Sequence, residues 1–457
     1  MLSRRRFLTA SAASAAFAAT SVPAIAASGE VDVAIVGAGA AGVAAARRFS
    51  GTRARIAVIE ASDRIGGRCW TDTTSFGMPF DRGAQWLTAP DVNPLVPVAM
   101  KSGLDMVPAS SSQRVRIARR YARTGEMEDY LTATVRASRA IVDAGRKQDT
   151  SAAQAMPKDL GDWQSAIEFT LGPYSYGKDL ADLSATDLAR SADRDNGLGC
   201  RQGLGALIVR LAEGLPVQLS SPVSKIDWSE RNKIEIVTAR GRVYARAVII
   251  TVSVGVLGKL AFDPELPKRY ADALDKLRLG SRDRIALDLP GNPLGLQPDE
   301  LVFEKATSDH TAAIVANVHG TTLCTVEIGG KFGADLTAAG EPAMLAFALD
   351  WLTGLYGSDL RKAVRKTGAT RWNYDPWTLG AASAAAPGGQ WARAALAEPV
   401  RDRIFFAGEA THETLWGTVG GAWASGERAA DAVLKKLGVT GEAAAETKRP
   451  SRTSRRR

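Results

Sequence analysis

A glycine-rich turn between two apolar stretches constrains the fold of this chain more than any other feature. Residues 31–36 form an apolar run, residues 37–42 read Gly-Ala-Gly-Ala-Ala-Gly, and an alanine-rich stretch continues to about residue 48. A second apolar run over residues 55–60 ends on the carboxylate of Glu60. This order predicts a buried parallel strand, a tight turn, a helix and a second strand, which is the βαβ pattern that binds a dinucleotide.

The residue types in this unit suit a bound dinucleotide. Gly37 permits the tight turn out of the strand, and Gly39 has no side chain to keep a pyrophosphate away from the backbone amides at the helix N-terminus. Gly42 permits close packing of the helix against the strand. Glu60 follows Gly42 by 18 residues, a spacing that suits a carboxylate bound to a ribose diol.

The residues after Glu60 indicate which dinucleotide is bound. Residues 61–68 read Ala-Ser-Asp-Arg-Ile-Gly-Gly-Arg, so two glycines and an arginine extend the site beyond the adenosine half. A flavin needs close backbone approach and positive charge near its second phosphate. The segment resembles the FAD fingerprint of the flavin amine oxidase family, which includes polyamine oxidases, monoamine oxidases and flavin histone-lysine demethylases.

Three later segments extend this resemblance. Residues 81–86 read Asp-Arg-Gly-Ala-Gln-Trp and resemble the family's turn beside the flavin ring. Residues 221–226 match a segment whose valine backbone contacts adenine in relatives. Residues 372–380 resemble the Trp…Asp-Pro…Gly segment of polyamine oxidases and flavin histone demethylases.

A closing element completes the resemblance near the C-terminus. Residues 403–412 form an apolar strand followed by Gly-Glu, so Glu409 is expected near the second ribose or the ribityl and pyrophosphate region. Residues 416–421 lead into a helix that is predicted to run to Leu437 and to end at Gly438. The N-terminus of that helix would point at the flavin pyrimidine edge, where its dipole favours negative charge.

The resemblance covers about residues 30–437, with its motifs in the family's order, and it implies a set of cofactor contacts. The cofactor is expected to be FAD. We expect it to be non-covalent, because Ala381 stands near the cysteine that monoamine oxidases use for attachment. The expected cofactor-binding residues are Gly37, Gly39, Ala41, Gly42, Glu60, Gly67, Arg68, Gly83, Ala84, Gln85, Trp86, Val223, Glu409, Thr418 and Val419.

The predicted fold class is α/β, with a Rossmann-like FAD-binding domain and an α+β substrate-binding domain. The first would be assembled from residues 28–105, 200–262 and 396–438, and the second from residues 106–199 and 263–395. The local patterns predict a mostly helical insertion at 110–195, a hairpin at 233–246, a separate buried strand at 247–252, strands at 284–289, 313–318 and 323–328, and an amphipathic helix at 342–355.

The resemblance implies oxidation of a C–N bond in a small-molecule amine. A neutral amine loses a hydride from its α-carbon to flavin N5, and water hydrolyses the resulting imine. O2 or another electron acceptor then reoxidises the flavin. The expected catalytic residues are Arg284, Thr418 and Trp372.

Three positions depart from the family pattern. Arg284 stands where relatives carry a lysine that holds a water at N5, and arginine is not equivalent because it is planar and does not deprotonate. The aromatic cage that relatives carry is thin in this chain, since Ala382 stands in place of an expected tyrosine and Thr418 occupies the second cage position, as in the demethylase branch. Trp372, Trp391 and Trp416 are the candidates to compensate for the missing ring.

Alternative functions use the same scaffold. An L-amino-acid oxidase would need an arginine clamp for the substrate carboxylate, and arginines within residues 112–146 are candidates. A desaturase acting on a C–C bond is a further alternative. A catalytically altered flavin-binding protein is the alternative from a different class, because the lysine and the tyrosine are both substituted.

The N-terminus reads as an export signal. Residues 3–8 read Ser-Arg-Arg-Arg-Phe-Leu, and an alanine-rich apolar stretch follows and ends near Ala26. This pattern predicts a twin-arginine signal peptide over residues 1–26, export through the twin-arginine machinery and a periplasmic or secreted protein. We expect no integral membrane segment, because no stretch is long and apolar enough to cross a bilayer.

Charge and cysteine content exclude two other classes of function. Of the net charge of +9, three positive charges lie in the predicted signal and six in residues 448–457 of a basic tail predicted over residues 439–457. This leaves a net charge of about zero for the rest of the chain and argues against nucleic-acid binding. The tail is expected to be disordered. Cys69, Cys200 and Cys324 are too widely spaced for a metal site or a disulfide framework, so we expect them to be packed as small apolar residues.

Overall fold

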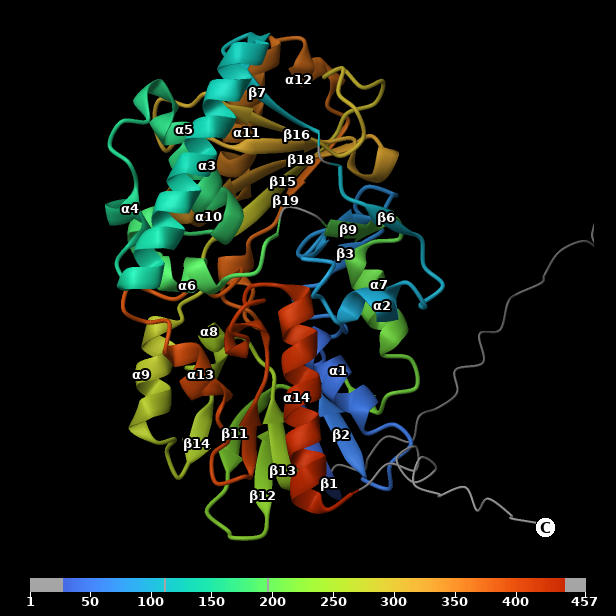
Figure 1. Ribbon diagram of the computed structural model, residues 1–457. Coiled ribbons are helices and arrows are strands. Elements are labelled where there is room, and N and C mark those ends of the chain that lie inside the picture. Colours follow the sequence, from blue (N-terminus) through green and yellow to red (C-terminus); the bar gives the residue numbers. More distant parts are fainter. Residues whose placement is uncertain (1–27, 111, 195–196, 440–457) are drawn as a thin grey trace, which may run out of the picture.

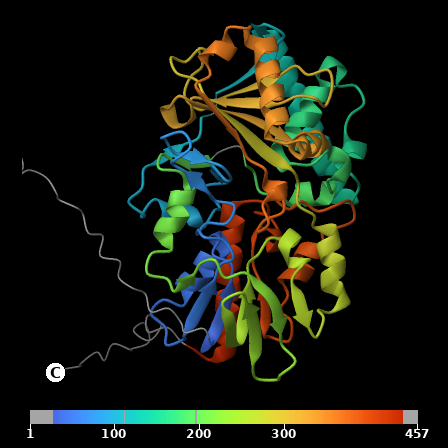
Figure 2. The same ribbon diagram turned by 180° about the vertical axis from the view of Figure 1, so that it is seen from behind.

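The computed structural model describes residues 28–110, 112–194 and 197–439 (Figure 1). The predicted signal peptide at residues 1–26 lies outside the described residues, as does the predicted basic tail except for Val439. Two halves, each built around a sheet, are stacked one above the other in Figure 1, and the view from behind shows the same division (Figure 2). The α/β fold class is as predicted.

The lower half in Figure 1 contains an eight-stranded sheet assembled from distant parts of the chain. Its order is β10 (Val217–Gln218), β2 (Ile56–Ile59), β1 (Ser28–Val36), β13 (Gly241–Ile250), β12 (Ile234–Thr238), β11 (Val223–Asp227) and β14 (Ala261–Asp263), and β20 (Ile404–Phe406) pairs with β13. β1 is parallel to both β2 and β13, whereas β12 is antiparallel to β13. Val33, Ala34 and Ile35 are fully buried, because strands in the middle of such a sheet are covered on both faces.

Two helices cover one face of this sheet. They are α1 (Ala40–Arg48) and α14 (Val419–Leu437), which lie side by side in Figure 1. The predicted strand, glycine turn, helix and second strand are therefore confirmed. Gly438 has a positive φ of 68° and ends α14, as the sequence predicted.

β13 differs from the prediction of a hairpin followed by a separate buried strand. The hairpin of β12 and β13 is present, but β13 runs without a break from Gly241 to Ile250. The sequence around Arg246 and Ala247 contains no glycine, proline or other turn residue that would end the strand there. The first half of β13 pairs with β12, and its last three residues pair with β20. A single strand therefore includes both the second strand of the predicted hairpin and the predicted buried strand.

The upper half contains a seven-stranded sheet. Its order is β19 (Lys366–Ala369), β15 (Arg282–Asp288), β18 (Leu323–Gly329), β17 (Ala313–Ala316), β16 (Glu300–Glu304), β7 (Gln113–Ile117) and β8 (Arg120–Tyr121). The predicted helix near residues 342–355 is α11 (Glu341–Tyr356), which buries one face through Met344, Ala348 and Leu352. It packs on the sheet with α10 (Gly330–Ala339).

The segment at 110–195 is helical after its start, but the expectation of a mostly helical insertion was wrong for its first residues. β7 and β8 belong to the upper sheet, where β7 pairs in parallel with β16. Val115 and the neighbouring Arg116 are both buried, so the strand is held by its pairing with β16 and β8 and not by a one-sided apolar pattern. The helical elements are α3 (Thr124–Lys147), α4 (Ala152–Ala155), η1 (Gly161–Trp163), α5 (Gln164–Phe169), the π-helical turn η2 (Thr170–Tyr174), η3 (Leu180–Asp182) and α6 (Ala185–Arg190).

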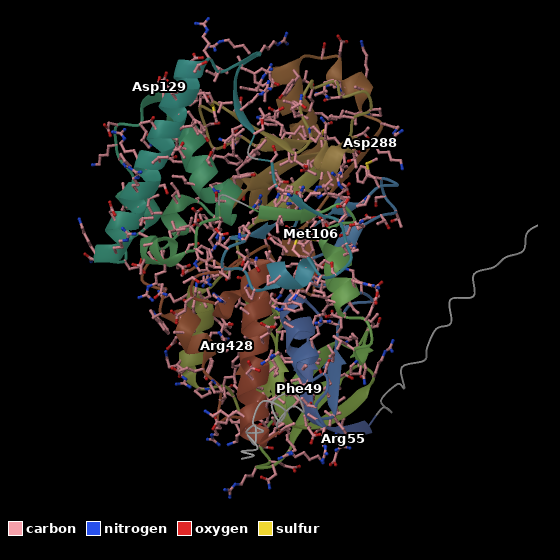
Figure 3. The ribbon with its side chains drawn as sticks, turned by 45° about the vertical axis from the view of Figure 1, so that its right-hand side comes forward. Phe49, Arg55, Met106, Asp129, Asp288 and Arg428 are labelled. Atoms are coloured by element: carbon pink, nitrogen blue, oxygen red, sulfur yellow. The ribbon has the colours of Figure 1, made fainter. Side chains whose placement is uncertain are left out.

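Smaller elements fill the waist between the halves and the flanks. Met106, in β6, lies at this waist (Figure 3). These elements are β3 (Thr71–Asp72), β4 (Phe80–Asp81), β5 (Leu87–Thr88), β6 (Met106–Pro108), β9 (Gly197–Cys200), α2 (Leu95–Ala99), α7 (Leu204–Leu211), α8 (Val254–Leu257), α9 (Lys268–Lys276), α12 (Leu360–Ala363), α13 (Ala392–Ala397), η4 (Val318–Gly320), η5 (Trp372–Tyr374) and η6 (Glu409–Thr411).

Two further sequence expectations bear on the described residues. Cys69, Cys200 and Cys324 are all buried with free thiols, so the prediction that they pack as apolar residues is confirmed. Across the described ranges, none of the helices has both the length and the apolar character needed to span a bilayer.

Candidate functional site

A large cavity lies where the two halves meet. Its volume is about 1160 Å³, which exceeds the roughly 300–1,000 Å³ of ordinary small-molecule sites. Its walls come from the N-terminus of α1, the turn at 82–88, α3, the end of η2 and the N-terminus of α14. The space therefore suits two molecules side by side, a cofactor and a substrate.

The structure brings the predicted site residues together around this cavity. Every predicted cofactor-binding residue lines it except Gly42, and so do all three predicted catalytic residues. Gly42 lies behind the lining, where a Cβ atom would come within 1.9 Å of the Gly37 oxygen. Its role is therefore close packing of α1 on the turn.

Two glycine turns form an open cradle at the start of α1. Gly37 and Gly67 both have positive φ, 107° and 57°, and Gly39 forms a bridge with Gly66. A Cβ atom on Gly39 would meet only Gly66 O at 3.8 Å and Gly67 Cα at 3.9 Å, so its absence keeps the cradle open. The first N–H groups of α1 have no acceptor within the helix and face this opening. Such a cradle fits a pyrophosphate.

Glu60 is fixed at the rim of the cradle. Its Oε2 accepts a hydrogen bond from the Ala38 amide at 2.6 Å, and its Oε1 accepts from the amide and the hydroxyl of Ser62 at 2.9 and 2.8 Å. A carboxylate has about four acceptor positions. One position on Oε2 therefore remains for a ribose hydroxyl.

Thr251 is a cradle residue that sequence reasoning missed. It lines the cavity, and its hydroxyl donates to Val36 O at 2.9 Å and lies 3.2 Å from Gly37 O. This bonding holds the carbonyl end of β1 against the turn. Its position directly after a buried parallel strand was the available signal, because ligands bind at the carboxyl ends of such strands.

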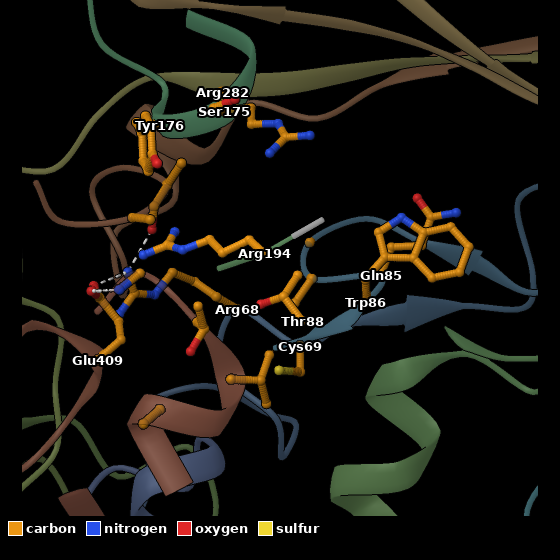
Figure 4. A pocket seen from close by; sticks show the side chains of 18 of the residues that line it. Arg68, Cys69, Gln85, Trp86, Thr88, Ser175, Tyr176, Arg194, Arg282 and Glu409 are labelled. Carbon is orange, nitrogen blue, oxygen red and sulfur yellow. Dashed lines mark hydrogen bonds and ion pairs between the residues drawn. The ribbon is translucent and has the colours of Figure 1, made fainter. Parts of the chain in front are cut away.

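Glu409 and Arg68 form an ion pair of 2.9 Å (Figure 4). Glu409 also accepts from the Ser383 hydroxyl at 2.6 Å, the Ser383 amide at 3.1 Å and the Gly417 amide at 2.9 Å. Burial would raise the pKa of Glu409, but Arg68 and the neighbouring donors hold it below its ordinary value. These contacts use the acceptor positions of the carboxylate, so its main effect is to position Arg68 and the chain at Gly417.

Arg284 is held on three sides. Its Nε donates to Glu327 Oε1 at 2.8 Å, and its Nη1 donates to the carbonyl oxygens of Asp81, at 2.6 Å, and Gly83. Burial would raise the pKa of Glu327, but Arg284 and Arg282 hold it below its ordinary value, so Glu327 is a carboxylate. Arg284 thus attaches the turn at 81–86 to the upper sheet while still facing the cavity.

Of the three tryptophans expected to compensate for the missing cage ring, Trp372 alone lines the cavity. Its Nε1 donates to Arg82 O at 3.0 Å, and its ring meets Trp70 edge to face with centroids 6.5 Å apart. Trp416 is buried behind the wall. Trp391 is 45% exposed on the surface, so the expectation for it was wrong.

Thr418 combines two roles at the start of α14. Its hydroxyl accepts from the Gly421 amide at 3.0 Å and caps the helix, and the same hydroxyl donates to Leu415 O at 2.6 Å. Thr418 and Val419 both line the cavity. The positive end of the α14 dipole therefore faces the space between the halves.

Arginines other than those predicted line the substrate side. Among the arginines of residues 112–146, Arg146 alone reaches the cavity, whereas Arg114 pairs with Glu300 and Arg116 donates to Leu355 O. Arg194 and Arg282 line it instead (Figure 4). No motif in the sequence distinguishes these two from the other arginines, because only the fold brings them to the cavity.

Comparisons with known proteins identify the family of this chain. Residues 40–434 match the model of the family described as flavin containing amine oxidoreductase. The chain is 29% identical to lysine-specific histone demethylase 2 of Homo sapiens over 88% of this chain and 53% of that protein, so it spans about half the length of this relative. It is 28% identical to probable polyamine oxidase 4 of Arabidopsis thaliana, over 86% of this chain and 85% of that one.

Solved structures share the fold. The cyclohexylamine oxidase from Brevibacterium oxydans IH-35A superposes with a TM-score of 0.75 and 21% identity, covering 89% of this chain and 99% of that chain. A putrescine oxidase bound to putrescine superposes with a TM-score of 0.76 and 21% identity, covering 89% and 100%. The overall fold is therefore common to this chain and these two proteins.

Proposed function

Because the chain belongs to the flavin-containing amine oxidoreductase family and is an FAD-dependent amine oxidase, we propose that it oxidises the C–N bond of a small-molecule amine at the cavity between its halves. The neutral amine loses a hydride from its α-carbon and a proton from its nitrogen and becomes an imine. Water hydrolyses the imine to a carbonyl compound and releases the nitrogen as ammonia or an amine. When bound, FAD supplies the two-electron acceptor for this oxidation, and O2 or another acceptor takes the electrons afterwards. The observation that supports this proposal is the joining of the nucleotide cradle and a separate substrate space in one cavity.

The described residues fit FAD along the lower part of the cavity. The amides at the start of α1 would hold the pyrophosphate, Glu60 a ribose and the Val223 backbone the adenine. Arg68, oriented by Glu409, would supply positive charge near the second phosphate. We propose non-covalent binding, since alanine at position 381 has no nucleophilic side chain.

The residues around the reacting end provide orientation and electrostatics. Trp372 forms an apolar wall that excludes water, and the α14 N-terminus at Thr418 favours negative charge at the edge that it faces. Arg284 places a fixed positive charge at the turn 81–86. We propose that Arg284 takes the position of the family's lysine and affects reoxidation more than amine oxidation.

Export is a second part of the proposal. The Arg-Arg pair within residues 3–8, followed by an apolar stretch that ends near Ala26, supports delivery through the twin-arginine machinery to the periplasm or the medium. Replacing Arg4, Arg5 and Arg6 together with lysine should retain the protein in the cytoplasm of a bacterial host. Export of the triple variant at the wild-type rate would contradict this route.

The test of the function is an anaerobic titration. The FAD-loaded protein is mixed with a panel of amines and amino acids, and the flavin absorbance is followed. Bleaching by one chemical class establishes amine oxidation and names that class. If none of the compounds lowers the flavin absorbance, the result would instead favour a catalytically altered flavin-binding protein or a desaturase.

A further inference from the structure

The guanidinium of Arg194 lies near Ala382, the position at which relatives are expected to carry a cage tyrosine. A Cβ atom built on Gly417 would lie 3.5 Å from Ala382 Cβ and 3.7 Å from Arg194 Nη1, so Arg194 is a near neighbour of Ala382. Thr418 follows Gly417 directly. Ala382, one of the two positions that depart from the cage pattern, therefore lies near the Arg194 head group, and Thr418, the other, lines the same cavity.

Aromatic rings and one carbonyl hold Arg194 in place. Its Nη2 donates to Trp416 O at 2.6 Å, and its guanidinium lies 4.5 Å from the Trp416 ring centroid and 5.2 Å from that of Tyr176. Its Nε is buried without a hydrogen-bond partner. None of the ion pairs among the described residues includes Arg194, since Asp187 pairs with Arg393 and Glu409 with Arg68. Burial lowers the pKa of Arg194, and Asp187 and Glu409 oppose this shift only in part, so a bound carboxylate would stabilise its charge.

Arg282 adds a second guanidinium on the same wall. It lies 4.8 Å from the Tyr174 ring centroid, and its side chain is 32% exposed. Tyr174 and Tyr176 are two residues apart at the end of η2, and Figure 4 shows Tyr176, Arg282 and Arg194 together at this side of the cavity. Rings from one short segment therefore support both cations.

The local charges leave an excess of positive charge. Glu327 is shared between Arg284, at 2.8 Å, and Arg282, at 3.4 Å, so one carboxylate serves two guanidiniums. Asp193 and Asp299 also line the cavity. Asp299 is engaged elsewhere, because it accepts from the His319 amide at 2.8 Å beside Trp86.

We propose that Arg194 and Arg282 form a carboxylate-binding subsite, so that the substrate is an amine that also carries a carboxylate, as an amino acid does. This inference rests on the proposed amine oxidation and names its substrate class. The planar donor fork of arginine matches a carboxylate with two parallel hydrogen bonds. The same pair of charges repels a second ammonium group, so a diamine is a poor substrate.

Binding without turnover tests the subsite. The FAD-loaded protein is titrated with 4-methylpentanoate, which has the carboxylate and side chain of leucine but no amine, and binding is followed by the change in flavin absorbance. R194Q and R282Q should each raise the Kd roughly 10- to 100-fold, the loss expected for a charge-assisted hydrogen bond, and R194K should recover part of it. The control is R139Q on the outer face of α3, because Arg139 does not line the cavity.

Matched substrates provide the second measurement. L-leucine and 3-methylbutylamine differ only by the carboxylate, as do L-ornithine and putrescine. The amino acid of each pair should bleach the flavin at a higher rate per concentration, and R194Q should remove that advantage. Equal rates within each pair, or equal 4-methylpentanoate binding by wild type and both glutamine variants, would overturn the subsite.

The two proposals fail in different ways. Arginine-dependent binding of 4-methylpentanoate without bleaching by any amine would contradict amine oxidation and leave the carboxylate subsite standing. Bleaching by simple amines without binding of 4-methylpentanoate would support amine oxidation and contradict the carboxylate subsite. FAD content and Tm of each variant are measured first, and if R194Q does not load FAD, the comparison is made with R282Q.

Discussion

Arg284 on β15 and Glu327 on β18 stand directly opposite each other in the antiparallel sheet, and their side chains form a buried ion pair of 2.8 Å. The same guanidinium donates to the Asp81 carbonyl at 2.6 Å. One side chain therefore joins the upper sheet to the turn at 81–86. The position of that turn depends on a contact between the two halves.

Replacing Arg284 with alanine should destabilise the protein by about 3–5 kcal/mol, because it leaves a buried carboxylate without its closest partner. Arg282 lies farther from Glu327, at 3.4 Å, and compensates only in part. Urea denaturation measures the loss. The double variant R284A/E327Q should recover stability, since it removes the unpaired charge, and a double variant no more stable than R284A would contradict this account.

Arg284 should also affect the two halves of the catalytic cycle unequally. In R284A, reoxidation by O2 should slow far more than anaerobic bleaching by the best amine, because a fixed positive charge favours the transfer of electrons to oxygen. Stopped-flow absorbance separates the two steps. R284K, which keeps the charge, is the control, and equal slowing of both steps in R284A would rule out the role.

Gly39 and Gly42 should respond differently to alanine. A methyl group on Gly42 would lie 1.9 Å from Gly37 O, so G42A should lose folded protein. The methyl group on Gly39 meets no atom closer than 3.8 Å, so G39A should keep its circular dichroism and Tm but lose FAD occupancy. The ratio of flavin to protein after purification measures the difference, and full FAD occupancy in G39A would argue against the cradle.

Thr418 should contribute to stability as a helix cap. T418A removes the hydroxyl that accepts from the Gly421 amide, which should lower the free energy of unfolding by about 1 kcal/mol. T418S retains the hydroxyl and should be close to the wild type. A loss of the same size in T418S would mean that the methyl group, not the cap, is responsible.

Lys178 should make stability depend on pH. Burial lowers the pKa of Lys178 to about 8, from an ordinary value of 10.5, while its Nζ donates to Ala384 O at 2.9 Å. Between these values the unfolded chain binds more protons than the folded protein, so the free energy of unfolding rises with pH across this window. Urea denaturation at pH 7.5 and 9.5 should show a larger rise in the wild type than in K178M. The same rise in both proteins would contradict the lowered pKa.

The nucleotide unit could be predicted because its signals are local. The run at 31–36, the glycines at 37–42 and Glu60 follow one another along the chain, and each residue type has one physical use. By contrast, β7 depends on pairing with β16, far along the chain. Its alternating arginines gave no apolar run to detect.

Other parts depend on packing that no local pattern encodes. β9 contains two glycines, which disfavour a strand. It forms by pairing with β5 and β6. A Cβ atom on Gly199 would come within 2.6 Å of both Trp86 and His319, so only glycine fits there. Arg194 is similar, since its place beside Ala382 results from the meeting of segments that are distant in the sequence.

The continuous strand β13 also determines when the protein can finish folding. It pairs with β1 from the start of the described chain and with β20, which is formed by Ile404–Phe406. A chain emerging from the ribosome can therefore form the first βα unit early, but it cannot close the sheet until nearly all of its length has been synthesised. Pairings this distant are slow to form, because the entropy of loop closure must be overcome first. Thr251 joins the cradle to that sheet, so we expect FAD to bind only after the sheet is complete.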